Sequence, residues 1–247
     1  MAKPPPVHPL PGALARALRD LAVIALVPTT ACLLYVLCMY ALQRAAWLDT
    51  RTGGYALELI FGIGLLLGWW LCQRWLPLPE SHRVAPRIGR VRAGCWGVLA
   101  GVGMLLFDQL LMHALASAGI EIEAANEDVI RQTLGHAPVF GLVQIALVAP
   151  LVEELIFRQR LFGRFWRAGH PGWGVVVTSL LFATLHEFGV DAGQPWHAWL
   201  ILMGLYAASG GFFAWLYWRS GRLQTPIVAH AINNLVLCVG MLWETAA

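Results

Sequence analysis

Seven long apolar runs divide this chain, and they constrain its fold more than any other feature. A helix needs about 20 apolar residues to cross the hydrocarbon core of a bilayer, and the runs approach that length. With 58% hydrophobic and 13% charged residues, the chain lies outside the range of soluble domains, in which about a quarter of residues are charged. We expect an all-α, polytopic transmembrane helix bundle with seven spans, or eight, near residues 21–42, 55–75, 94–117, 138–160, 172–188, 197–218 and 224–243.

The composition also argues against other classes of protein. The formal net charge of +3 is too small an excess to indicate a nucleic acid or another polyanionic partner. The five cysteines are odd in number and form no CxxC pair. They favour buried free thiols over a disulfide or zinc framework. The expected surroundings are therefore a lipid bilayer.

The N-terminal sequence sets the expected domain boundaries. Residues 1–20 are Pro-rich and then basic, and we expect them to form a cytoplasmic segment. The apolar run that follows reaches polar sequence without a small-x-small cleavage site, which indicates an uncleaved first anchor. Residues 21–247 then form a single transmembrane domain with no visible repeat. The one long polar connection, 121–134, is expected to be a short interfacial helix.

The distribution of basic residues predicts the orientation. The 17 Lys and Arg residues, with three exceptions, lie in alternate connections that share one side of the bundle. The exceptions are Arg44, Arg51 and Arg131. The positive-inside rule places that side, with the N-terminus, in the cytoplasm and the C-terminus outside. Because the chain has many Arg and almost no Lys residues, we expect a bacterial inner (cell) membrane protein.

Several polar side chains interrupt the apolar runs of three spans. An ionisable group inside the hydrocarbon region costs several kcal/mol unless it is paired or faces a cavity, so such residues are functional candidates. The candidates are Glu153, Glu154 and Arg158 in one span, His186 in the next, and His230, Asn233 and Asn234 in the last.

The spacing of the first group predicts its pairing. Glu154 and Arg158 are four residues apart, so they share a helix face where a carboxylate and a guanidinium can pair. Glu153 is rotated by about 100° from Glu154 in a helix of 3.6 residues per turn. This arrangement leaves Glu153 free to act as a general base.

A turn brings a second group to the depth of the first. Gly169, Pro171 and Gly172 mark a tight turn between antiparallel helices. Positions 153 and 186 lie equally far from its midpoint, so at 1.5 Å per residue both stand roughly 22–25 Å from the turn. We therefore expect a carboxylate and an imidazole at one level near mid-membrane. In the last span, His230 and Asn234 are four residues apart and share one face.

Other interpretations fit parts of this pattern. Glu154 and Arg158 alone can be a structural ion pair, and His230 with Asn234 can make interhelical hydrogen bonds. A Ser209 and His230 dyad would leave the acid pair unexplained. A non-proteolytic transporter or scaffold could use the same polar cluster, although a transporter usually shows two related halves.

A zinc-dependent peptidase is a further alternative. The HExxH motif is absent, because His186-Glu187 is followed by Val190 where the second His must stand. Two Glu and two His residues can nevertheless form a zinc site. We expect no cofactor and no metal, with zinc left open as the alternative.

Three motifs together resemble a known family. Glu153-Glu154-x-x-x-Arg158, Phe182-x-x-x-His186 and His230-x-x-x-Asn234 are similar to the motifs of the CAAX protease and bacteriocin-processing enzyme family, also called CPBP or Abi. That family includes the type II CAAX prenyl endopeptidases. The resemblance covers about residues 138–240, which would be the peptidase core.

The resemblance implies an activity and a role for each motif residue. It implies a glutamate-dependent intramembrane endopeptidase that matures a membrane-associated peptide or protein. Glu153 would activate the attacking water with His186, and His230 and Asn234 would stabilise the oxyanion. Glu154 and Arg158 would support the site. Nothing in the sequence selects one substrate within this class.

Overall fold

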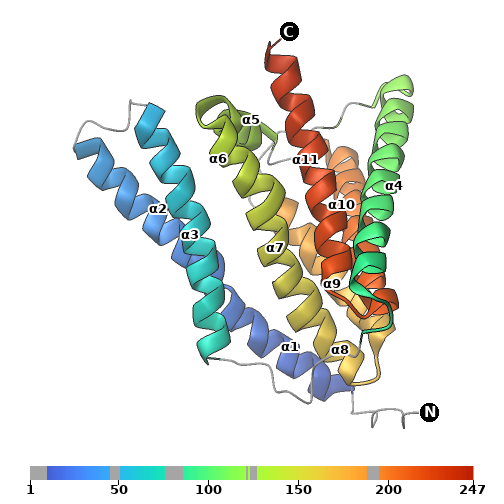
Figure 1. The fold of residues 1–247 in the computed structure, drawn as a ribbon. Helices are drawn as coiled ribbons and strands as arrows, with labels where there is room; N and C mark the ends of the chain where they lie inside the picture. Colours follow the sequence, from blue (N-terminus) through green and yellow to red (C-terminus); the bar gives the residue numbers. More distant parts are fainter. Residues whose placement is uncertain are drawn as a thin grey trace.

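The structure is a computed structural model that describes residues 10–44, 51–75, 86–120, 122, 127–187 and 195–246. Within these ranges the chain is helical and has no strand (Figure 1). The elements are α1 (Leu10–Ile24), α2 (Leu26–Arg44), α3 (Arg51–Trp75), α4 (Arg90–Ser117), α5 (Glu127–His136), α6 (Pro138–Val143), η2 (Gln144–Val148), α7 (Ala149–Glu154), η3 (Leu155–Phe162), α8 (Gly163–Arg167), α9 (Pro171–Glu187), α10 (Trp196–Ser220) and α11 (Gln224–Ala246).

The expected all-α polytopic bundle is confirmed. Each of the seven expected spans coincides with a helix or a run of consecutive helical segments. Five segments of the described chain are long and apolar enough to cross a membrane: Leu10–Arg44, Arg90–Ser117, Pro138–Arg167, Trp196–Ser220 and Gln224–Glu244. Helix α3 contributes a shorter apolar stretch, Leu59–Arg74, and α9 has 17 residues.

Helix α1 begins within the expected N-terminal segment, residues 1–20. It starts at Leu10, so the boundary expected at residue 20 lies inside a helix. Asp20 is fully buried, and its carboxylate accepts two hydrogen bonds from Arg164, at 2.5 and 3.2 Å. Because both partners are buried, this pair fixes α1 against α8 across the lower end of the bundle (Figure 1).

Two helix pairs approach closely at glycines spaced four residues apart. A Cβ added at Gly68 of α3 would lie 2.7 Å from the Cα of Val27 in α2. A Cβ added at Gly101 of α4 would lie 2.8 Å from the Ala229 carbonyl oxygen in α11. Gly64 and Gly97 occupy the preceding turns and make similar contacts. These are GxxxG interfaces, in which the missing side chains let two backbones meet.

The segments from α6 to α8 form one continuous helical rod that descends through the middle of the molecule (Figure 1). The rod turns into α9 at Gly169, which has φ 87°, so the expected turn is confirmed. The expected interfacial helix corresponds to α5, while residues 121 and 123–126 of that stretch lie outside the described residues. Arg131 of α5 pairs with Glu127 at 2.8 Å and with Glu244 of α11 at 3.0 Å.

Candidate active site

The acid pair lies in the rod between two π-helical segments. Helix α7 ends at Glu154, with η2 before it and η3 after it. A π turn accommodates one additional residue, and it commonly occurs at functional sites in helices. Since each residue turns the chain by about 100° around the helix axis, these segments set the direction in which Glu153 and Glu154 project.

Glu154 forms the predicted pair with Arg158. The Oε2 of Glu154 lies 3.1 Å from the Nε of Arg158, and both side chains are at most 1% exposed. The two atoms are within ion-pair distance but do not have the alignment of a hydrogen bond. Arg158 also donates a hydrogen bond to the Gly210 carbonyl at 3.2 Å. The pair therefore joins the rod to α10.

Three aromatic rings surround the buried guanidinium. The Cζ of Arg158 lies 4.8 Å from the ring centre of Phe182, 5.2 Å from that of Phe213 and 5.6 Å from that of Phe157. Aromatic faces attract a cation, and the attraction increases when water is excluded. These rings offset part of the cost of burying Arg158.

Glu153 points away from Arg158 and towards two histidines. Its Oε2 lies 3.9 Å from the Nε2 of His186 and 3.8 Å from the Nε2 of His230. Its side chain is 26% exposed, whereas that of Glu154 is fully buried. The prediction that Glu153 and His186 lie at one depth is confirmed, and so is the prediction that only Glu154 pairs with Arg158.

His186 is held by its backbone contact and by two rings. Its Nδ1 lies 2.8 Å from the Phe182 carbonyl oxygen, and because a carbonyl only accepts, this nitrogen carries the hydrogen. The imidazole stacks on Tyr206, with ring centres 4.7 Å apart. Its ring centre also lies 4.2 Å from that of Phe182. In the neutral imidazole, Nε2 is then an acceptor that faces Glu153.

His230 links the two glutamates. Its Nδ1 lies 3.1 Å from the Oε1 of Glu154, while its Nε2 faces Glu153. The ring stacks on Phe213 with ring centres 4.6 Å apart. Three helical elements thus contribute to one cluster, namely α7 with Glu153 and Glu154, α9 with His186, and α11 with His230.

Asn234 contacts the main chain of the rod. Its amide nitrogen donates a hydrogen bond to the Ile145 carbonyl at 3.0 Å. Ile145 belongs to η2, so this bond is directed at the backbone of the rod. The role of Asn234 as an oxyanion donor stays a prediction.

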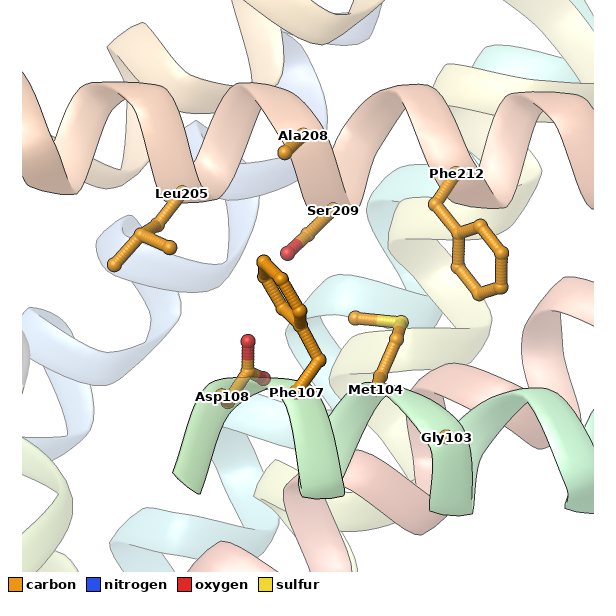
Figure 2. A pocket seen from close by; sticks show the side chains of 8 residues that line it. All are labelled: Gly103, Met104, Phe107, Asp108, Leu205, Ala208, Ser209 and Phe212. Carbon is orange, nitrogen blue, oxygen red and sulfur yellow. The ribbon is translucent and has the colours of Figure 1, made fainter. Parts of the chain in front are cut away.

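The structure argues against a dyad of Ser209 and His230. Ser209 lines a cavity of about 250 Å³ between α4 and α10 that also contains Asp108 and Phe107. Figure 2 shows the Ser209 hydroxyl and the Asp108 carboxylate directed into this space. His230 instead faces the glutamates. The candidate serine and the candidate base therefore point to different places.

The aromatic residues around the site were not identified as contributors from the sequence. Phe213, Tyr206 and Phe157 contact the histidines or Arg158, yet single aromatic residues in apolar spans carry no local signal. In the described part of the chain, no group of three His, Cys, Asp or Glu side chains is arranged to hold a metal ion.

Comparison with known proteins gives a match to one family model. Residues 135–236 match the family model described as "Type II CAAX prenyl endopeptidase Rce1-like", which confirms the resemblance seen in the three motifs. All seven residues named in the three motifs lie inside the matched region.

One relative adds to this match. The chain is 29% identical over 146 residues to a Bacillus subtilis (strain 168) protein named "Putative membrane peptidase YdiL". The alignment covers 58% of this chain and 54% of the relative, so the chain spans about half the length of the curated relative it matches. No solved structure matches the chain.

Proposed function

We propose that this protein is an intramembrane endopeptidase that hydrolyses a peptide bond in a membrane-associated peptide or protein with a glutamate-activated water. One observation carries the proposal: the Oε2 of Glu153 lies almost equally far, 3.9 and 3.8 Å, from the Nε2 atoms of two histidines on separate helices. These distances exceed those of direct hydrogen bonds and suit a bound water or substrate group.

Glu153 and His186 supply the basic half of the site. The Oε2 of Glu153 is buried, and none of the described groups donates a hydrogen bond to it. A water between this oxygen and the Nε2 of His186 would donate to both. As the water oxygen bonds to the carbonyl carbon, its proton passes to Glu153, and the carbonyl oxygen becomes an oxyanion. Glu153 then returns the proton to the leaving amine as the C–N bond breaks.

His230 supplies the donor for the oxyanion. Glu153, Glu154 and Arg158 together carry one negative charge when ionised. A donor at the Nε2 of His230 requires the doubly protonated imidazole, since its Nδ1–H is directed at Glu154. The Nε2–H is then available to the developing oxyanion. A donor aimed at such charge in a dry site typically contributes about 10²-fold or more to the rate.

The setting of the site supports a membrane substrate and an orientation. The cluster lies on helices whose outer faces are apolar and exposed. Arg90 begins α4, Arg164 lies in α8, and Arg222 lies in the turn between α10 and α11. Figure 1 draws these segments at the end of the bundle where α1 meets α8. We place that end, with the N-terminus, in the cytoplasm of a bacterium and the protein in its inner membrane, following the positive-inside rule.

Mapping new N-termini in membranes tests this function. Wild-type protein and the Glu153→Gln, His186→Ala and Ser209→Ala variants would be produced at equal levels in one bacterial host, and neo-N-termini in the membrane fraction would be identified by mass spectrometry. We expect termini in or beside apolar segments with wild-type protein and with Ser209→Ala, and their loss with the other two variants.

Ser209→Ala is the matched control, because Ser209 lies in the separate cavity between α4 and α10. Neo-termini that depend on Ser209 would show a serine mechanism instead. An identical set of termini with Glu153→Gln and wild-type protein would refute the role given to the glutamate.

A further inference from the structure

The main chain of the rod contains a break in its hydrogen bonding just before the acid pair. In η2, the Ala149 amide donates to the Gln144 carbonyl, five residues earlier. The next carbonyl, that of Ile145, would need the amide of residue 150 in the same register. Residue 150 is a buried proline, which has no N–H.

Asn234 provides the missing donor. Its side-chain nitrogen lies 3.0 Å from the Ile145 carbonyl oxygen. One turn earlier on α11, His230 contacts the Glu154 carboxylate at 3.1 Å. Helix α11 therefore holds the rod on both sides of Pro150, once at η2 and once at the acid pair.

We propose that Asn234 is a positioning residue that satisfies the carbonyl left open by Pro150 and so maintains the π turn that directs Glu153 and Glu154. A π turn contains one residue more than an α turn. If it relaxed, the following residues would rotate by up to about 100° relative to α9 and α11. Glu153 would then leave the face that it shares with His186.

This inference rests on the proposed function only for its effect on turnover, since the hydrogen bond itself belongs to the fold. An amide nitrogen carries two hydrogens, so counting donors does not separate a positioning role from an oxyanion role. Replacement of Pro150 does separate them. In Pro150→Ala, a main-chain N–H is present at residue 150 and the Ile145 carbonyl no longer depends on a side chain.

A double-mutant cycle with Asn234→Ala, Pro150→Ala and the combined variant tests the inference. The rates use a membrane peptide identified by its neo-N-terminus. With Pro150 present, Asn234→Ala should lower kcat by about tenfold or more with little change in KM, as expected for a misplaced catalytic group. In the Pro150→Ala background, the same replacement should change kcat little. An equal loss of kcat in both backgrounds would overturn the positioning role and assign Asn234 to the oxyanion.

Thermal unfolding of the same four proteins in detergent needs no substrate, so it separates failure of this inference from failure of the proposed function. Asn234→Ala should lower the Tm with Pro150 present and much less in the Pro150→Ala background, because neighbouring changes that share one interaction are not additive. Strictly additive changes in Tm would refute the link between Asn234 and the Ile145 carbonyl. If Asn234→Ala does not accumulate, Asn234→Asp, which has similar size but lacks the donor, takes its place in the cycle.

Discussion

Glu153 and Glu154 are neighbours in the chain, but their surroundings give them different tasks. Glu154 is fully buried, and its two oxygens each lie 3.1 Å from a nitrogen, one of Arg158 and one of His230. Glu153 remains 26% exposed and faces two imidazole nitrogens. The difference follows from a rotation of about 100° per residue in a helix, which places adjacent side chains on different faces.

The buried ion pair predicts how two single variants differ in stability. Arg158→Ala would leave Glu154 buried without its cation. Removing one partner of a buried ion pair lowers the free energy of unfolding by about 3–5 kcal/mol. Glu153→Gln changes a partly exposed group of nearly equal size and should be much milder. Melting temperatures of the two variants in detergent would therefore rank Arg158→Ala well below Glu153→Gln. Equal values would mean that Arg158 does not support the fold.

Much of the site follows from spacing alone, and the remainder depends on backbone geometry. The pairing of Glu154 with Arg158 and the meeting of Glu153 with His186 follow from helix periodicity and a recognisable turn. The contact of Asn234 with Ile145 does not, because it depends on a π turn that shifts the hydrogen-bonding register. Pro150 was the sequence signal available for this contact, since a proline inside an apolar helix leaves one main-chain carbonyl without its N–H donor.

At the scale of elements, close helix packing positions α11 and its histidine. Gly97 and Gly101 of α4 meet Thr225, Val228 and Ala229 of α11, directly before His230. Because the glycine backbone contacts the partner backbone, a change in α4 can displace the first turns of α11. The distance between α4 and α11 is thus coupled to the position of His230.

Gly101→Ala should destabilise this interface. Its new Cβ would lie 2.8 Å from the Ala229 carbonyl oxygen, and overpacking of this kind typically costs about 1–3 kcal/mol. Gly103→Ala is the matched control. Gly103 lies on the same helix as Gly101, and a Cβ added there would meet nothing within 4 Å. Detergent unfolding should show a lower Tm for Gly101→Ala and an unchanged one for Gly103→Ala. Similar losses in both variants would contradict the packing explanation, because Ala favours a helix more than Gly does and Gly103 has room for a Cβ.

The helices were predictable where apolar runs are long, and less so at α1. The Pro-rich and basic character of residues 1–20 obscured the helix that begins at Leu10. Asp20 was its strongest clue, as an acid beside an apolar run requires a partner. That partner, Arg164, is 144 residues away, and no local pattern reveals so distant a contact.

On the scale of the whole molecule, a bundle of apolar helices surrounds the polar cluster of Glu153, Glu154, Arg158, His186 and His230. Exposed apolar side chains cover the outer faces of the helices, while Arg158, Glu154 and His230 are buried within the bundle. Such an arrangement excludes bulk water, which strengthens each electrostatic interaction in the site. Under the proposed function, it would bring a membrane-embedded substrate close to Glu153.

The rate of substrate cleavage by purified Glu153→Gln protein tests the central claim most directly. Wild-type protein and the variant would be reconstituted in liposomes with the peptide identified by its neo-N-terminus, in the presence of a metal chelator, after confirming equal melting temperatures. We predict that wild-type protein cleaves the peptide and that Glu153→Gln is slower by about 10²-fold or more, because the general base is lost. Cleavage by Glu153→Gln at the wild-type rate, or loss of wild-type cleavage on chelation, would contradict a glutamate-activated water and, in the second case, favour a zinc peptidase.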